Sequence, residues 1–396
     1  MMKLRKTLYT ALCLMAGLCT LSGCIEEFNA EIPSDETNLL VVEGSIRAND
    51  YNTFILSRTQ TLDDSDDRVI ENNASVSVRG TDGSEITAYL VPYSDCYGCW
   101  IDALNSNVEY YLHIEVDGEV YESEPQKPMP TEGISDVACV QNTPESDLDI
   151  LVTPESPDDP STIHYYQWTY EETWEVHPDY TTNMYYDVNL GKGIFKMHQF
   201  PERGWINDTG STIMVGSSRN YESQHIEKLK LYDIDRSDER VHHRYSGLIH
   251  QRAISKAEYE YELARRQAGD EMGGLFTPMP SALPTNIHCL TSSKRVIGYI
   301  GCSLNTSAYR FFINADDYNI YYPYKPDMRY WAINPSNALC LRLVNDGMYL
   351  CIWKDERLSG GELETAWAYE YQLDVRYRGA YIYEPDFWKL EENVSY

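Results

Sequence analysis

Short stretches of alternating hydrophobic and polar residues recur from Asn38 onwards, separated by turn residues about every 8–12 positions. A period of two is typical of half-buried β-strands. Asp117-Gly118 favours a hairpin turn, since Gly tolerates the positive φ of a tight turn. The strands predicted up to residue 128 are 39–46, 53–57, 74–79, 86–91, 100–103, 108–116 and 119–123. This set predicts an immunoglobulin-like or transthyretin-like β-sandwich over residues 38–128.

Three prolines, Pro125, Pro128 and Pro130, end this pattern, because proline cannot donate a hydrogen bond to a ladder. We therefore predict a domain boundary there, followed by a larger β-rich domain over residues 131–396. Its predicted strands are 137–141, 148–152, 161–176, 184–188, 229–234, 296–303, 309–314, 339–344, 348–353 and 366–376. A capping box formed by Ser255 and Glu258 predicts one helix, at about 256–268. The predicted fold class is all-β with two domains.

The first 23 residues have a different pattern, a basic start followed by the apolar run Leu8–Leu18. That run is shorter than the roughly 20 residues that span a bilayer, and the arrangement is typical of a signal peptide. Leu21-Ser22-Gly23-Cys24 resembles a bacterial lipobox, in which the Cys24 sulfur carries a diacylglyceryl group after export. We therefore expect residues 1–23 to be a lipoprotein signal peptide and Cys24 to anchor the protein in the membrane by its acyl chains.

The polar residues 24–37 are expected to form a tether between the anchor and the first sandwich. They begin with Cys24-Ile25-Glu26-Glu27. Acidic residues directly after a lipidated Cys resemble an export signal to the outer face of the outer membrane. We expect a lipid-anchored outer-membrane protein displayed at the cell surface; a periplasm-facing position is the alternative.

The charge of the chain limits its partners. After residue 23 there are 29 Lys and Arg against 62 Asp and Glu, a net charge of −33. Such a surface repels nucleic acids, whose binding depends on Lys and Arg displacing counterions, and anionic lipid. The hydrophobic content of 42% is too high for a disordered chain. We expect no nucleic-acid partner and no membrane contact besides the anchor at Cys24.

Several stretches together resemble the DUF4249 family of outer-membrane lipoproteins. These are 40–44 (LVVEG), 56–59 (LSRT), 165–174 (YYQWTYEETW), 244–246 (RYS), 256–263 (KAEYEYEL), 273–276 (GGLF), 296–299 (VIGY) and 385–388 (PDFW). The resemblance implies an all-β secreted lipoprotein, often encoded beside a TonB-dependent outer-membrane transporter. The family often has a Cys-rich stretch before its final motif, which is absent here. It has no established catalytic residues, so only Cys24 can be transferred as a site.

Seven cysteines follow Cys24, and an odd number leaves at least one thiol unpaired. Cys96-Tyr97-Gly98-Cys99 has the spacing of one half of a zinc site, but no second C-x2-C exists to complete four ligands. Cys340 and Cys351 flank a predicted hairpin turn at residues 345–347. In one register they face each other and in the next they lie on a diagonal, so a disulfide between them is a candidate pairing.

No established catalytic, metal or phosphate motif occurs in the chain. His242-His243 fall in a predicted strand and should point to opposite faces, away from any shared ion. We expect no cofactor and no metal, and no ligand-binding residue can be assigned from the sequence.

The 33 Tyr and 8 Trp are the main compositional excess. Exposed aromatic rings anchor protein partners or stack on sugars, although strands are also rich in them. We expect a non-catalytic binding or accessory module beside a TonB-dependent transporter, with Tyr166, Trp168, Tyr170, Trp174 and Trp205 as candidate anchors. The alternatives are a surface glycan- or peptide-degrading enzyme and a structural or adhesive surface protein.

Overall fold

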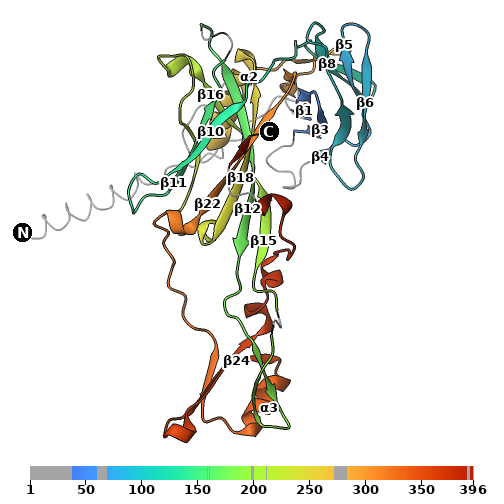
Figure 1. The fold of residues 1–396 in the computed structure, drawn as a ribbon. Coiled ribbons are helices and arrows are strands. Elements are labelled where there is room, and N and C mark those ends of the chain that lie inside the picture. Colours follow the sequence, from blue (N-terminus) through green and yellow to red (C-terminus); the bar gives the residue numbers. More distant parts are fainter. Residues whose placement is uncertain are drawn as a thin grey trace, which may run out of the picture.

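A computed structural model describes residues 38–59, 69–157, 159, 161–197, 200–210, 212–271, 283–389 and 393–395. The predicted signal peptide and the tether with Cys24 lie outside these residues. The described chain is mostly strand, with two α-helices, so the predicted all-β class is confirmed (Figure 1). Neither helix of this described part is long and apolar enough to cross a membrane.

The N-terminal strands form a first sandwich whose sheet has the order β19-β9-β8-β5-β6-β7-β3-β1-β20, with β4 beside β3. Its strands are β1 (Leu40–Gly44), β3 (Asp50–Arg58), β4 (Val69–Ile70), β5 (Ser75–Gly80), β6 (Glu85–Leu90), β7 (Tyr97–Ile101), β8 (Tyr110–Val116), β9 (Glu119–Ser123), β19 (Ile287–Cys289) and β20 (Val296–Gly298). The turn predicted at Asp117-Gly118 is present. Val116 lies opposite Glu119, and both turn residues have positive φ, 53° and 78°.

This sandwich is completed by residues from far beyond the predicted boundary. β19 pairs with β9, β20 runs parallel to β1, and the short strands β2 (Ile46–Arg47) and β21 (Cys302–Ser303) pair beside them. Ile287, Val296 and Ile300 are buried in the same core as the N-terminal strands. The range 38–128 is therefore only part of the sandwich, and residues 131–396 are not a separate unit. Three prolines end a run of strands, but they do not exclude a later return of the chain.

A second sandwich follows, with a large sheet of order β15-β12-β18-β22-β26, β16 beside β12, and a small sheet of order β10-β11-β17. Its strands are β10 (Ile134–Val140), β11 (Leu148–Pro154), β12 (Tyr165–Val176), β15 (Gly204–Thr209), β16 (Met214–Ser217), β17 (Leu229–Ile234), β18 (Arg244–Ala253), β22 (Ser307–Asn314) and β26 (Val394–Ser395). Trp168, Tyr245 and Phe311 of the large sheet pack with Ile150 of the small sheet in one core. The predicted helix is present as α2 (Lys256–Glu271).

The chain leaves the second sandwich twice, between β12 and β15 and between β22 and β26, and both excursions build one lobe. This distal lobe comprises residues 178–197 and 324–384 and lies at the end opposite the first sandwich (Figure 1). Its elements are β13 (Met184–Asp187), β14 (Lys192–Phe195), β23 (Tyr330–Ile333), α3 (Asn337–Asn345), β24 (Met348–Asp355) and β25 (Leu363–Tyr369). β23, β25 and β24 form a sheet in that order. Tyr186, Leu343 and Trp367 share its core.

The strand predicted at 339–344 is wrong, because these residues form α3. Ser336 caps this helix, its hydroxyl accepting a hydrogen bond from the Leu339 amide at 3.2 Å. The buried Cys340 and Leu343 lie on one helical face. A short apolar run is compatible with a strand or with a helix. Here the N-cap residue Ser336 favours the helix.

The composite first sandwich leads to a test with two fragments. A fragment of residues 38–128 lacks the partners of β1 and β9 and leaves part of the core open. We expect the thermal unfolding of this fragment to show no cooperative transition. The same fragment joined by a short glycine linker to residues 283–304 should show a β-rich circular dichroism spectrum and a cooperative thermal transition. Equal cooperativity in both fragments would contradict the composite sandwich.

Candidate functional site

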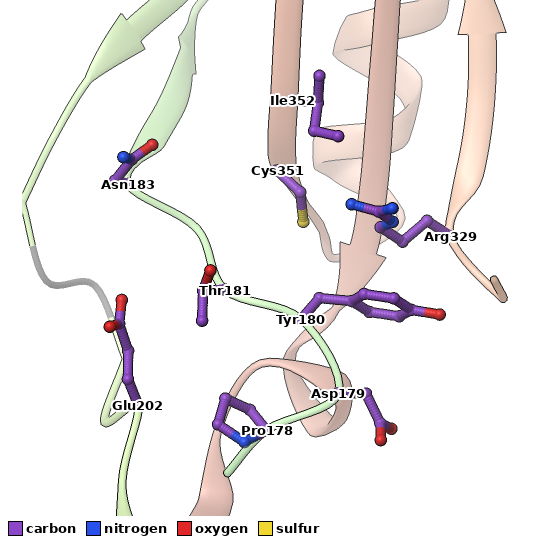
Figure 2. Close-up of a pocket in the computed structure, with 9 residues that line it drawn as sticks. All are labelled: Pro178, Asp179, Tyr180, Thr181, Asn183, Glu202, Arg329, Cys351 and Ile352. Carbon is purple, nitrogen blue, oxygen red and sulfur yellow. The ribbon is translucent and has the colours of Figure 1, made fainter. Parts of the chain in front are cut away.

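A cleft of about 480 Å³ opens where the distal lobe meets the second sandwich (Figure 2). Its two walls come from the two excursions of the chain: residues 178–183 and Glu202 form one wall, and Arg329 with β24 forms the other. The lining residues are Pro178, Asp179, Tyr180, Thr181, Asn183, Glu202, Arg329, Cys351 and Ile352. The Thr182 hydroxyl donates a hydrogen bond of 2.5 Å to the Leu350 carbonyl, so the two walls are joined. The volume is in the roughly 300–1,000 Å³ range of small-molecule sites.

Arg329 has several contacts with neighbouring residues that hold its side chain in place. Its Nε and Nη2 donate to the two Asp327 oxygens at 2.9 and 2.8 Å, and these hydrogen bonds lower the pKa of Asp327 and raise that of Arg329. The guanidinium carbon lies 4.6 Å from the Tyr180 ring centre and 5.1 Å from that of Trp331. Trp331 also donates its indole N–H to Asp327 at 2.9 Å. The cation thus contacts two rings and one carboxylate before any ligand arrives.

The floor of the cleft contains the thiol of Cys351. Burial raises its pKa to about 11, so the thiol is protonated at neutral pH. Its Sγ donates to the Tyr349 carbonyl at 3.6 Å. A protonated, buried thiol is a poor nucleophile, and together with Ile352 it gives the floor an apolar character.

Charged pairs at one edge of the cleft join the lobe to the second sandwich. Arg378 binds both Asp179, at 2.5 Å, and Glu239 of the short helix η3 (Glu239–Val241). Nearby, the Glu175 carboxylate accepts from His177 at 2.7 Å and pairs with Arg203 at 2.9 Å. Burial acts against the ionised form of Glu175, but these two hydrogen bonds prevail and lower its pKa to about 2.

The cysteines predicted as candidate sites are not brought together. Cys340 lies on α3 in one hydrophobic cluster, and Cys351 lies on β24 in another. Both are free thiols, and the hairpin register that suggested their disulfide does not exist because residues 337–345 are helical. Cys96 and Cys99 are free as well. In the described part of the chain, no group of three or more His, Cys, Asp or Glu side chains could hold a metal ion.

His242 and His243 lie just before β18, outside the strand in which they were predicted. Their rings still diverge: His243 stacks on His177 with ring centres 3.8 Å apart, and His242 packs on Tyr322. Burial lowers the pKa of His243, which favours its neutral form. Both therefore belong to the junction between the second sandwich and the distal lobe.

The aromatic anchors predicted in the second sandwich are largely core residues. Tyr166, Trp168 and Trp205 are only 2%, 0% and 4% exposed, so they cannot serve as a docking surface. The exposed rings lie elsewhere. Eighteen of the 28 large apolar side chains exposed in the described chain belong to the distal lobe, among them Tyr324, Tyr330 and Trp331.

Neither the cleft nor this surface was predicted from the sequence. The cleft joins residues more than a hundred positions apart, which no local pattern shows. One signal was available: Asp327-x-Arg329 recurs as Asp355-x-Arg357 and Asp374-x-Arg376, and all three pairs form the same hydrogen-bonded fork.

Comparisons with known proteins relate the chain to one family. The profile of a family described as "Domain of unknown function (DUF4249)" matches residues 25–308, more than half of the chain. A comparison with curated proteins gives no match. Among solved structures, a two-fibronectin type-III domain segment from chicken tenascin matches at 13% identity, covering 54% of this chain and 90% of that one. Its TM-score is 0.13, which is too low to indicate a shared fold.

The low pKa of Glu175 makes the stability of the junction depend on pH. The free carboxyl has a pKa of 4.5 and the folded one about 2. Its contribution is therefore complete above about pH 4.5 and is lost as the pH falls towards 2. We expect Glu175→Gln to flatten the fall of the melting temperature over this range, whereas the exposed Glu145→Gln should leave it unchanged. Parallel curves for wild type and Glu175→Gln would contradict the assignment.

Proposed function

The chain belongs to the DUF4249 family, a domain of unknown function, and from this premise we propose that it is a lipid-anchored, non-catalytic binding or accessory module of the outer membrane. The partner that the resemblance implies is a TonB-dependent nutrient transporter. The lipobox at residues 21–24 supports an anchor at Cys24, and the acidic residues behind it support display at the cell surface.

The observation that carries the proposal is the surface of the distal lobe. Its exposed rings and aliphatic side chains have the composition of a docking surface, since Tyr, Trp and Arg dominate binding hot spots. Its charge differs from that of the remaining chain. The lobe has nine basic and eleven acidic residues, a net charge of −2, while the whole chain has −30. A partner can thus approach the lobe without the repulsion that the other surfaces exert.

The position of the lobe fits this role. β1, which follows the tether, lies in the first sandwich at the opposite end from the lobe (Figure 1). The 14 residues 24–37 can span at most about 50 Å when extended. Such a tether allows the protein to stand on the membrane or to lie against a neighbouring membrane protein, with the lobe free in either case.

The test is recovery of a transporter with the tagged protein from native membranes in mild detergent. We expect the triple variant Tyr324→Ser, Tyr330→Ser, Ile333→Ser to lose the transporter, because removing hot-spot side chains costs about 2 kcal/mol or more, roughly thirtyfold in affinity. None of these three residues lines the cleft, and Trp331 is not changed.

The matched control changes exposed side chains of the first sandwich, Tyr89→Ser, Tyr93→Ser and Leu290→Ser, and should retain the transporter. Equal recovery with both triple variants would contradict docking through the lobe. If the wild type recovers no transporter and the purified protein hydrolyses glycans or peptides, the enzyme alternative replaces this proposal.

A further inference from the structure

We propose that the cleft lined by Tyr180, Arg329 and Glu202 binds a neutral polyhydroxyl ligand, a saccharide of one or two rings. The inference is independent of the docking of a partner to the lobe, because it concerns a different set of side chains. It rests on the unpaired polar groups, the charge balance and the shape of the cleft.

The cleft presents several polar groups that have no hydrogen bond or ion pair with other described residues. These are the Thr181 hydroxyl, the Asn183 side-chain amide, the Glu202 carboxylate and Nη1 of Arg329. Figure 2 shows Thr181, Asn183 and Glu202 on one wall and Arg329 on the other. Donors and acceptors therefore occur together in one cleft. A hydroxyl group donates and accepts, so adjacent hydroxyls of a sugar can satisfy such a mixed set.

The charges of the cleft disfavour an ionic ligand. Asp327 compensates Arg329 through two hydrogen bonds, and Arg378 compensates Asp179. Glu202 is the one lining carboxylate without a described cationic partner, so an anion would meet repulsion there and find Arg329 already paired. A cation would be attracted by Glu202 but would face the Arg329 guanidinium. A neutral ligand avoids both penalties and can still accept a charge-assisted hydrogen bond from Nη1.

The shape and rigidity of the cleft favour the same class. Pro178, Ile352 and the protonated Cys351 supply apolar surface against which the C–H face of a sugar ring can pack. Arg329 is held by its contacts with two rings, and the Tyr180 hydroxyl accepts a hydrogen bond from the Met328 amide at 2.7 Å, so ordering these groups costs little on binding. The volume of about 480 Å³ accommodates a ligand of one or two rings.

The test uses the purified mature chain and saturation-transfer difference NMR, followed by titration calorimetry. The probes are maltose, cellobiose, lactose, sucrose, trehalose and N,N′-diacetylchitobiose, with glycylglycine and citrate as charged comparisons. We expect at least one saccharide to bind and neither charged probe to do so. Thr181→Val removes one hydroxyl from an exposed residue at constant shape and should weaken binding about fivefold to tenfold. Arg329→Met should abolish it.

The matched control is Arg357→Met, because Arg357 forms the same fork with Asp355 outside the cleft, at 2.8 and 2.6 Å. It should bind saccharide like the wild type. Thermal melting checks that the variants are folded. If Arg329→Met is unfolded, the saccharide affinity of Thr181→Val alone tests the proposal. The proposal is overturned if no saccharide of the panel binds, if Thr181→Val leaves the affinity unchanged, or if glycylglycine or citrate binds in its place.

Discussion

The arrangement of the molecule depends on a buried carboxylate in the middle of its longest strand. Glu172 of β12 is 4% exposed, and both of its oxygens accept hydrogen bonds from Nη1 of Arg240, at 2.8 and 2.9 Å. Tyr245 of the neighbouring strand β18 donates to it at 2.7 Å. A buried carboxylate without such partners costs several kcal/mol, so β12, β18 and η3 must stay together. Both halves of β12 pair within the large sheet of the second sandwich, and the chain continues from Val176 into the distal lobe.

One connected set of contacts runs from this carboxylate to the cleft. Arg240 and Glu239 are neighbours on η3; Arg240 binds Glu172, and Glu239 binds Arg378. Arg378 in turn binds Asp179 at the edge of the cleft. The lobe is therefore fixed to the second sandwich by ion pairs as well as by the two chain crossings. Rigid placement matters for both proposed roles, because a docking surface and a preorganised cleft lose affinity when they must first be ordered.

The sequence predicted those parts of the fold that depend on local patterns. β9 and β17 agree with the predicted ranges 119–123 and 229–234, and the Asp117-Gly118 turn has the expected positive φ angles. The central strand β18 was not among the predicted ranges, because Gly247 and Gln251 interrupt the apolar row of Tyr245 and Ile249. The structure explains Gln251, which is buried and accepts a hydrogen bond from the Trp168 indole at 2.8 Å. Residues 337–345 were misread because a short apolar run has no unique period.

The candidate site could not be predicted because it arises from non-local contacts. Tyr180 and Arg329 are stacked only because two separate excursions of the chain build one lobe. Likewise, Tyr166 and Trp168 looked like binding anchors because composition does not distinguish a ring in the core from a ring on the surface. The return of residues 287–303 to the first sandwich is equally invisible to local patterns, since it depends on pairing across more than 160 positions.

Hydrogen–deuterium exchange of the full mature chain tests most directly whether the Glu172 network holds the lobe in place. With Glu172→Gln, the account predicts faster exchange in residues 171–176, in β15 and in the lobe around the cleft, while the first sandwich is unchanged. The control Glu171→Gln, on the same strand but with its side chain 55% exposed, should exchange like the wild type. Equal exchange of the lobe in wild type and Glu172→Gln would contradict the account.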